Sequence, residues 1–186
     1  MKVLLFLAKG FETMEASVFV DIMGWAGIEV VTCALQKTIT STFGVSVNAD
    51  ILLKDVCIDD YDALAIPGGF EEYGFYEDAF SGQAVKLINE FNDSGKMIAT
   101  ICVAALALGN SGILKGKKAT TYHLNHGQRQ KQLAEYGVIV VNEPVVRTKN
   151  IITSFCPQTG PAVAFLLLEE LVGTDKMQKT KNAMGF

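Results

Sequence analysis

Short apolar runs rich in valine and isoleucine alternate with helical patterns along most of the chain, and this alternation limits the possible folds more than any other feature. Parallel strands buried on both faces are continuous apolar runs, and helices usually connect them. The pattern therefore predicts an α/β fold with helices on both faces of a mostly parallel sheet. Strands are expected near Val3–Ala8, Glu29–Ala34, Ala63–Ile66, Met97–Ile101, Ala119–Tyr122, Val138–Val141 and Ile151–Ser154. Helices are expected near Met14–Ala26, Gly82–Asn92, Val103–Gly109, Gly127–Tyr136 and Pro161–Leu171.

The length, charge and cysteine usage narrow the class of protein. The 186 residues suit one domain, 1–186, and the stretch Lys37–Asp55 is expected to form a short antiparallel excursion with Gly44 at its turn. A net charge of -4 gives no basic surface for nucleic acid. The first apolar run ends at Lys9, and no apolar run is long enough to cross a membrane. Four scattered cysteines indicate neither a zinc site nor a disulfide framework, so we expect reduced thiols and a cytoplasmic location.

Cys102 lies where a buried-strand pattern gives way to small helix-forming residues. A sharp turn from strand to helix exposes its side chain above the sheet, and the amides at the start of the helix favour an anion there. Cys102 is therefore a candidate nucleophile. The alternative is a buried structural cysteine, the role we assign to Cys33, while Cys57 is expected at the surface.

Glu15 falls on the apolar stripe of the first helix, together with Val18, Phe19 and Ile22. Burial without a cation raises the pKa of a carboxyl group, so Glu15 could be protonated near neutral pH and donate a hydrogen bond to a thiolate or a substrate oxygen. The alternative is a first-turn glutamate that interacts with the helix dipole, a role that suits Glu12.

Two further segments follow strands at the end where open α/β sheets bind ligands. Pro67-Gly68-Gly69 could leave backbone amides uncovered and, with the amide of Val103, form an oxyanion hole, although such a segment is more often only a turn. His123 and His126 follow the strand near 119–122, and either could be the base that activates Cys102. Cys156 follows the strand Ile151–Ser154, where packing explains it well.

Together these segments resemble the ThiJ/PfpI superfamily, and within it the DJ-one branch named after a Parkinson's-disease-associated protein. The resemblance reaches about Gly173. It is carried by Leu7-Ala8-Lys9-Gly10 with Glu12, Met14 and Glu15, by Pro67-Gly68-Gly69, by Ala99-Thr100-Ile101-Cys102, by Thr120-Thr121 and by Ile152-Thr153-Ser154.

The resemblance implies a flavodoxin-like three-layer α/β/α sandwich, usually a homodimer, without a cofactor or metal. It implies that Cys102 is the reactive cysteine, that Glu15 is a protonated carboxyl beside it, and that the amides of Gly69 and Val103 face the substrate oxygen. Activities of the family include conversion of methylglyoxal to lactate, removal of early glyoxal adducts from proteins, redox sensing through a cysteine sulfinate and chaperone-like holding. Related bacterial proteins carry a thiazole monophosphate (thiamine) biosynthesis label.

The chain departs from the family pattern near the expected site. Val103 stands where the protease and glyoxalase-type branches carry a histidine after the cysteine. Tyr122 replaces the usual histidine after the paired threonines, with His123 one position later, and a shift of one residue can turn a side chain to the other face. Phe155 and Phe43 take the places of arginines, so anion binding is not expected there.

Two functional hypotheses follow, beside a structural relative with an inactive site. In the first, an enzyme of the glyoxalase or deglycase type, Cys102 attacks an aldehyde or glycated substrate and Glu15 shuttles the proton, with His123 as a further catalytic candidate. In the second, the protein is a redox sensor or chaperone-like stress protein in which Cys102 oxidises to a sulfinate.

Overall fold

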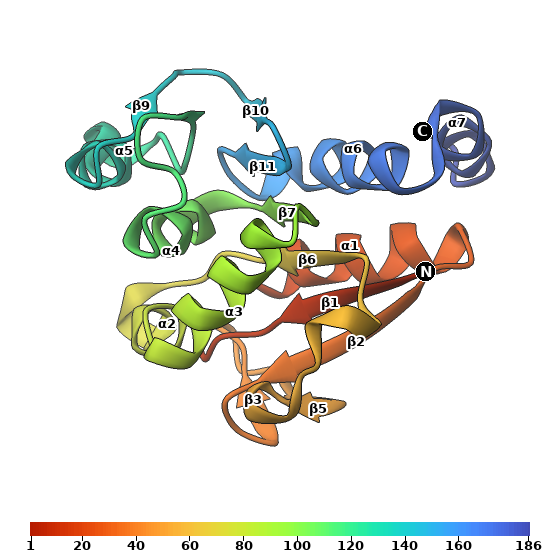
Figure 1. The fold of residues 1–186 in the computed structure, drawn as a ribbon, viewed down its shortest axis with the longest axis horizontal. Coiled ribbons are helices and arrows are strands. Elements are labelled where there is room, and N and C mark those ends of the chain that lie inside the picture. Colours follow the sequence, from red (N-terminus) through yellow and green to blue (C-terminus); the bar gives the residue numbers. More distant parts are fainter.

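A seven-stranded sheet forms the centre of the computed structural model, which describes all residues, 1–186 (Figure 1). The strand order is β10-β11-β7-β6-β1-β2-β5, and every neighbouring pair is parallel except β10 and β11. The strands are β1 (Lys2–Phe6), β2 (Glu29–Ala34), β5 (Ile51–Leu52), β6 (Ala63–Ile66), β7 (Met97–Thr100), β10 (Val145–Thr148) and β11 (Ile151–Ser154).

Helices cover both faces of this sheet, which gives the expected three-layer α/β/α sandwich of the flavodoxin-like type. On one face α1 (Thr13–Trp25) packs against α6 (Gly160–Val172), and α7 (Thr174–Ala183) packs on α6. On the other face α3 (Gly82–Asp93) packs on β6 and β7, beside α4 (Ala105–Asn110), and α5 (Gln128–Glu135) packs on α4. The short helix α2 (Phe75–Ala79) precedes α3.

The core follows from the apolar runs that predicted the strands. All four residues of β6 are fully buried, and large side chains such as Phe6, Phe19, Phe75 and Phe91 fill the space between sheet and helices. None of the helices is both long and apolar enough to cross a membrane.

The antiparallel excursion predicted for Lys37–Asp55 is confirmed over residues 38–48, whereas Ile51 and Leu52 join the main sheet as β5, parallel to β2. Antiparallel strands β3 (Thr38–Thr40) and β4 (Ser46–Asn48) pair with each other, and Gly44 lies in their connection with a φ of 87°. A positive φ is the conformation that glycine adopts without steric cost, which explains this residue at the turn.

The strands predicted at Ala119–Tyr122 and Val138–Val141 differ from the structure. They shorten to β8 (Lys118–Ala119) and β9 (Ile139–Val140), which pair with each other outside the main sheet. The amide of Thr120 donates to the hydroxyl of Thr153 at 3.0 Å instead of to a backbone carbonyl, so a side chain ends the ladder at this point.

Three elements were not predicted: α2, α7 and β10. The helix α7 is mostly polar, and α2 has five residues, so neither shows a clear apolar stripe. Strand β10 returns to β11 through Lys149 and Asn150, and Lys149 has a φ of 54°. A hairpin turn without glycine gives little signal in the sequence.

Candidate active site

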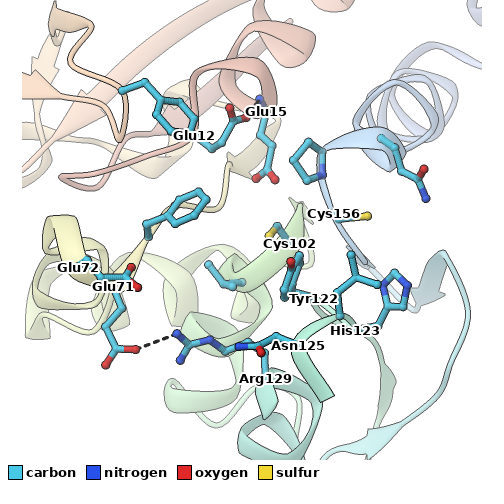
Figure 2. A pocket seen from close by; sticks show the side chains of 17 residues that line it. Glu12, Glu15, Glu71, Glu72, Cys102, Tyr122, His123, Asn125, Arg129 and Cys156 are labelled. Atoms are coloured by element: carbon cyan, nitrogen blue, oxygen red, sulfur yellow. Dashed lines mark hydrogen bonds and ion pairs between the residues drawn. The ribbon is translucent and has the colours of Figure 1, made fainter. Parts of the chain in front are cut away.

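A cavity of about 820 Å³ lies at the carboxyl ends of the central strands, where an open parallel sheet places its ligand site. Its walls come from residues far apart in the sequence, and Figure 2 shows the side chains that line it. The segments involved are 12–15, 69–72, 102–103, 122–129 and 156–158, with Phe43 from the β3–β4 connection. The cavity therefore gathers residues from all five segments that the sequence singled out, those of Glu15, Gly69, Cys102, His123 and Cys156.

Cys102 is held in a strained conformation directly after β7. Its φ is 59°, although it is not a glycine. The sequence predicts a helix that starts at Val103, but residues Cys102–Ala104 form a 3₁₀ turn and α4 begins after them. The hydroxyl of Thr121 donates to the carbonyl of Cys102 at 2.8 Å. A strained residue persists only where its surroundings fix it, and such residues cluster at functional sites.

Glu15 is fully buried, as its place on the apolar stripe predicts. Its Oε2 accepts a hydrogen bond of 2.6 Å from the amide of Gly68, while its Oε1 has no partner. A Cβ added at Gly68 would lie 2.8 Å from Oε2 of Glu15 and 2.9 Å from the Cβ of Cys102, so the glycine is what lets carboxyl and cysteine share this space.

The pKa values of this pair depend on burial. Burial raises the pKa of Glu15 to about 8, against the smaller lowering effect of the Gly68 amide. Burial also raises the pKa of the Cys102 thiol well above its usual value, and the negative charge of Glu15 adds to this, while the Val103 amide opposes it. Of the groups around Cys102, the Val103 amide has the expected effect of stabilising a thiolate. When Glu15 is protonated, it no longer repels a negative charge on the sulfur.

The amides predicted to form an oxyanion hole border the cavity. The N–H of Gly69 donates to no backbone carbonyl, and Gly69 and Val103 both line the cavity beside Cys102. A Cβ at Gly69 would clash with the carbonyl oxygen of Gly10, so a close backbone approach fixes this loop. The arrangement is compatible with the predicted role of both amides, which stays a prediction.

His123 lines the cavity but makes no hydrogen bond. Its ring stacks on Phe155 with centroids 3.9 Å apart, and its buried Nδ1 has no partner. No hydrogen bond joins it to Cys102, so its predicted role as a base stays a prediction. His126 does not line the cavity; it lies in a strained turn with a φ of 57°.

Aromatic and sulfur-containing side chains form part of the cavity wall. Phe70 and Tyr122 line the cavity, whereas Phe11 and Tyr73 do not. Cys156 lines the same cavity as Cys102.

Sequence reasoning missed the one arginine of the site. Arg129, from α5, forms an ion pair of 2.8 Å with Glu71 and lies over the ring of Tyr76 at 5.3 Å from its centroid. Asn125 and Gln158 were also missed. No local pattern marks these residues, because each lies in a polar segment whose direction only the tertiary structure sets. No group of three or more His, Cys, Asp or Glu side chains is arranged to hold a metal ion.

Comparisons with known proteins agree with this geometry. The model of the DJ-1/PfpI family matches residues 1–170. Protein dj-1beta of Drosophila melanogaster is 30% identical over 97% of this chain and 95% of its own length. Its crystal structure superimposes with a TM-score of 0.88 at 29% identity, covering 98% of this chain and 96% of that one.

Two further relatives show how varied the matched proteins are. The deglycase PfpI of Pyrococcus furiosus is 33% identical over 66% of this chain and 72% of its own length. Protein DJ-1 homolog B of Arabidopsis thaliana is 32% identical over 94% of this chain, which spans only 39% of that relative. The fold, the order of the site segments and the match over residues 1–170 lead to one conclusion: the chain belongs to the DJ-1/PfpI family.

Proposed function

We propose that the protein is a cysteine-dependent enzyme that acts on reactive aldehydes or their early protein adducts, without a cofactor. The observation that carries this proposal is the buried Glu15 carboxyl beside Cys102, with one oxygen free of hydrogen bonds. A relative that bears the name deglycase supports the same class of reaction.

The proposed first step is addition of the Cys102 thiol to an aldehyde carbonyl. The sulfur forms a bond to the carbonyl carbon, the C=O π bond breaks, and the thiol proton passes through Glu15 to the carbonyl oxygen, which gives a hemithioacetal. A carboxyl group with a pKa of about 8 can both accept and return a proton near neutral pH. The raised pKa of Cys102 makes its sulfur strongly nucleophilic once the proton has left.

The amides of Gly69 and Val103 are proposed to hold the oxygen while negative charge develops on it. No step is assigned to His123, whose ring is stacked on Phe155. For methylglyoxal the hemithioacetal would rearrange internally and be hydrolysed to lactate, so that one carbon is oxidised and its neighbour reduced without an external redox partner.

The test is turnover of methylglyoxal to lactate by the purified chain. Cys102→Ser should reduce kcat/KM by about 1,000-fold or more, because it removes the attacking atom. Cys57→Ser, a change at an exposed cysteine, is the matched control and should retain wild-type turnover. Full activity of the Cys102→Ser protein would refute the proposal.

A redox sensor is the second candidate, favoured by the free Oε1 of Glu15 and the Val103 amide near Cys102. Peroxide would oxidise the thiol to a sulfenate and then a sulfinate, with one water released from each peroxide, and a sulfinate could accept hydrogen bonds from both groups. The candidate predicts two added oxygen atoms on Cys102 in a peptide mass spectrum, with none on buried Cys33.

A homodimer in the cytoplasm is also proposed. Apolar side chains of α1 are exposed, such as Met14 at 58% and Trp25 at 62%, and a second copy could cover them. All four cysteines are unpaired, as in a reducing compartment. Sedimentation analysis that finds only monomers at micromolar concentration would exclude the dimer.

A further inference from the structure

The cavity is much larger than a small aldehyde needs. Its volume of about 820 Å³ falls in the range of roughly 300–1,000 Å³ that holds drug-sized ligands. Methylglyoxal would fill only a fraction of this space. The rest of the cavity is therefore available to a part of the substrate that does not react.

The ionisable side chains around that space are mainly acidic. Glu12, Glu71 and Glu72 line the cavity, and Arg129 is the only lysine or arginine that does so. The guanidinium of Arg129 is already paired with Glu71 at 2.8 Å. Neither Glu12 nor Glu72 forms an ion pair with a lysine or arginine. Glu12 also caps α1, where its Oε2 accepts a hydrogen bond of 2.8 Å from the amide of Glu15.

Two further observations indicate that the cavity is built for a ligand, and the second of them favours a cationic one. Glu15 is fully buried, lines the cavity and leaves its Oε1 without a partner. Phe43 and Phe70 also line it, 70% and 43% exposed, with their rings edge to face at 6.0 Å. Exposed aromatic rings attract cations through their faces.

The positions of these groups define how a substrate would lie. Figure 2 shows Cys102 in the middle of the cavity, with Glu12 on the side of Glu15 and Glu72 on the side of Glu71. We infer, on the basis of the proposed function, that the cavity selects aldehydes whose non-reacting part carries a positively charged ammonium group. The carbonyl reaches Cys102 while the cation lies toward Glu12 and Glu72.

The first test measures the charge preference at Cys102 without any turnover. Two methanethiosulfonate reagents of similar size are used, one ending in trimethylammonium and one in sulfonate, and each modification rate is divided by that with free cysteine. We expect the cationic reagent to be favoured on the order of tenfold at low salt, and less at high salt. The double variant Glu12→Gln/Glu72→Gln should bring the ratio close to that of free cysteine.

The matched control is Asp59→Asn/Asp175→Asn, which removes two carboxylates that do not line the cavity and should keep the wild-type ratio. A ratio near that of free cysteine in the wild type, an equal ratio in wild type and Glu12→Gln/Glu72→Gln, or no modification by either reagent would each overturn the inference. Because this test needs no catalysis, it separates the inference from the proposed function.

The second test uses turnover. The two α-oxoaldehydes 4-(trimethylammoniomethyl)phenylglyoxal and 4-neopentylphenylglyoxal differ by replacement of a cationic nitrogen with carbon. Each can rearrange internally to a 2-hydroxy acid, so their kcat/KM values isolate the charge. We expect the cation to be favoured on the order of tenfold in the wild type and to lose this advantage in the double variant. If no aldehyde is turned over while the reagent ratio holds, the proposed function fails and the charge selection stands.

Discussion

The two sides of the cavity are built in different ways. On the side of Glu15 and Cys102, α1 and β7 belong to the central sandwich, and the Gly68 amide fixes the carboxyl at 2.6 Å. On the side of residues 122–129, the chain has left the sheet and passes through turns in which Asn125 and His126 have positive φ values. The difference suggests that the reacting groups lie on the rigid side, while the other side shapes what can enter.

Glu15→Gln should have the largest effect if the rigid side carries the chemistry. Glutamine can still accept the hydrogen bond from Gly68 but cannot shuttle a proton, so we expect kcat/KM for methylglyoxal to fall by about 10²–10⁴-fold. Steady-state kinetics would show this. An unchanged kcat/KM would mean that Glu15 takes no part in the reaction, so the reacting groups would not lie on its side of the cavity.

The pH dependence of stability should show the same carboxyl. Because the pKa of Glu15 rises from 4.5 to about 8 on folding, the folded state binds more protons than the unfolded state between these values. The free energy of unfolding should therefore decrease as pH rises from about 5 to about 8, by up to about 1.4 kcal/mol per pH unit from this group. Urea denaturation of wild type and Glu15→Gln should differ by this slope, and parallel curves would contradict the raised pKa.

Gly68→Ala should have a smaller effect on stability but should disturb the site. Its Cβ would approach Glu15 and Cys102 to within 2.8 and 2.9 Å, so we expect a loss of about 1–3 kcal/mol in the free energy of unfolding, with reduced turnover. Gly82→Ala is the matched control, because no atom lies within 4 Å of its added Cβ. Equal stability of the two variants would show that the rigid side can adapt.

His123→Phe should have the smallest effect. Phenylalanine can keep the stacking on Phe155 while it removes both ring nitrogens, so we expect kcat/KM to stay within about threefold of wild type, far below the contribution of a general base. A fall as large as that of Glu15→Gln would restore His123 as the catalytic base.

The sequence predicted the features that depend on residues close together in the chain. The period of α1 placed Glu15 on a buried face, and the change from strand to helix placed Cys102 at a turn. The helix predicted near Pro161–Leu171 is also confirmed, since α6 spans Gly160–Val172 with Pro161 in its first turn. Each of these features depends on a few adjacent residues, so a short stretch of sequence carries the whole signal.

Contacts between residues far apart in the sequence, and the pKa values that follow from them, were decided by the tertiary structure. Arg129 meets Glu71 across 58 positions, and the Thr153 hydroxyl ends the ladder of a strand that the pattern placed in the main sheet. The pKa of Cys102 rises instead of falling, because burial and the charge of Glu15 outweigh the Val103 amide. The sequence by itself determined the family of folds and the placing of Glu15 and Cys102, the proposed reacting pair, since both are local. The charge of the cavity arises from segments that only folding brings together.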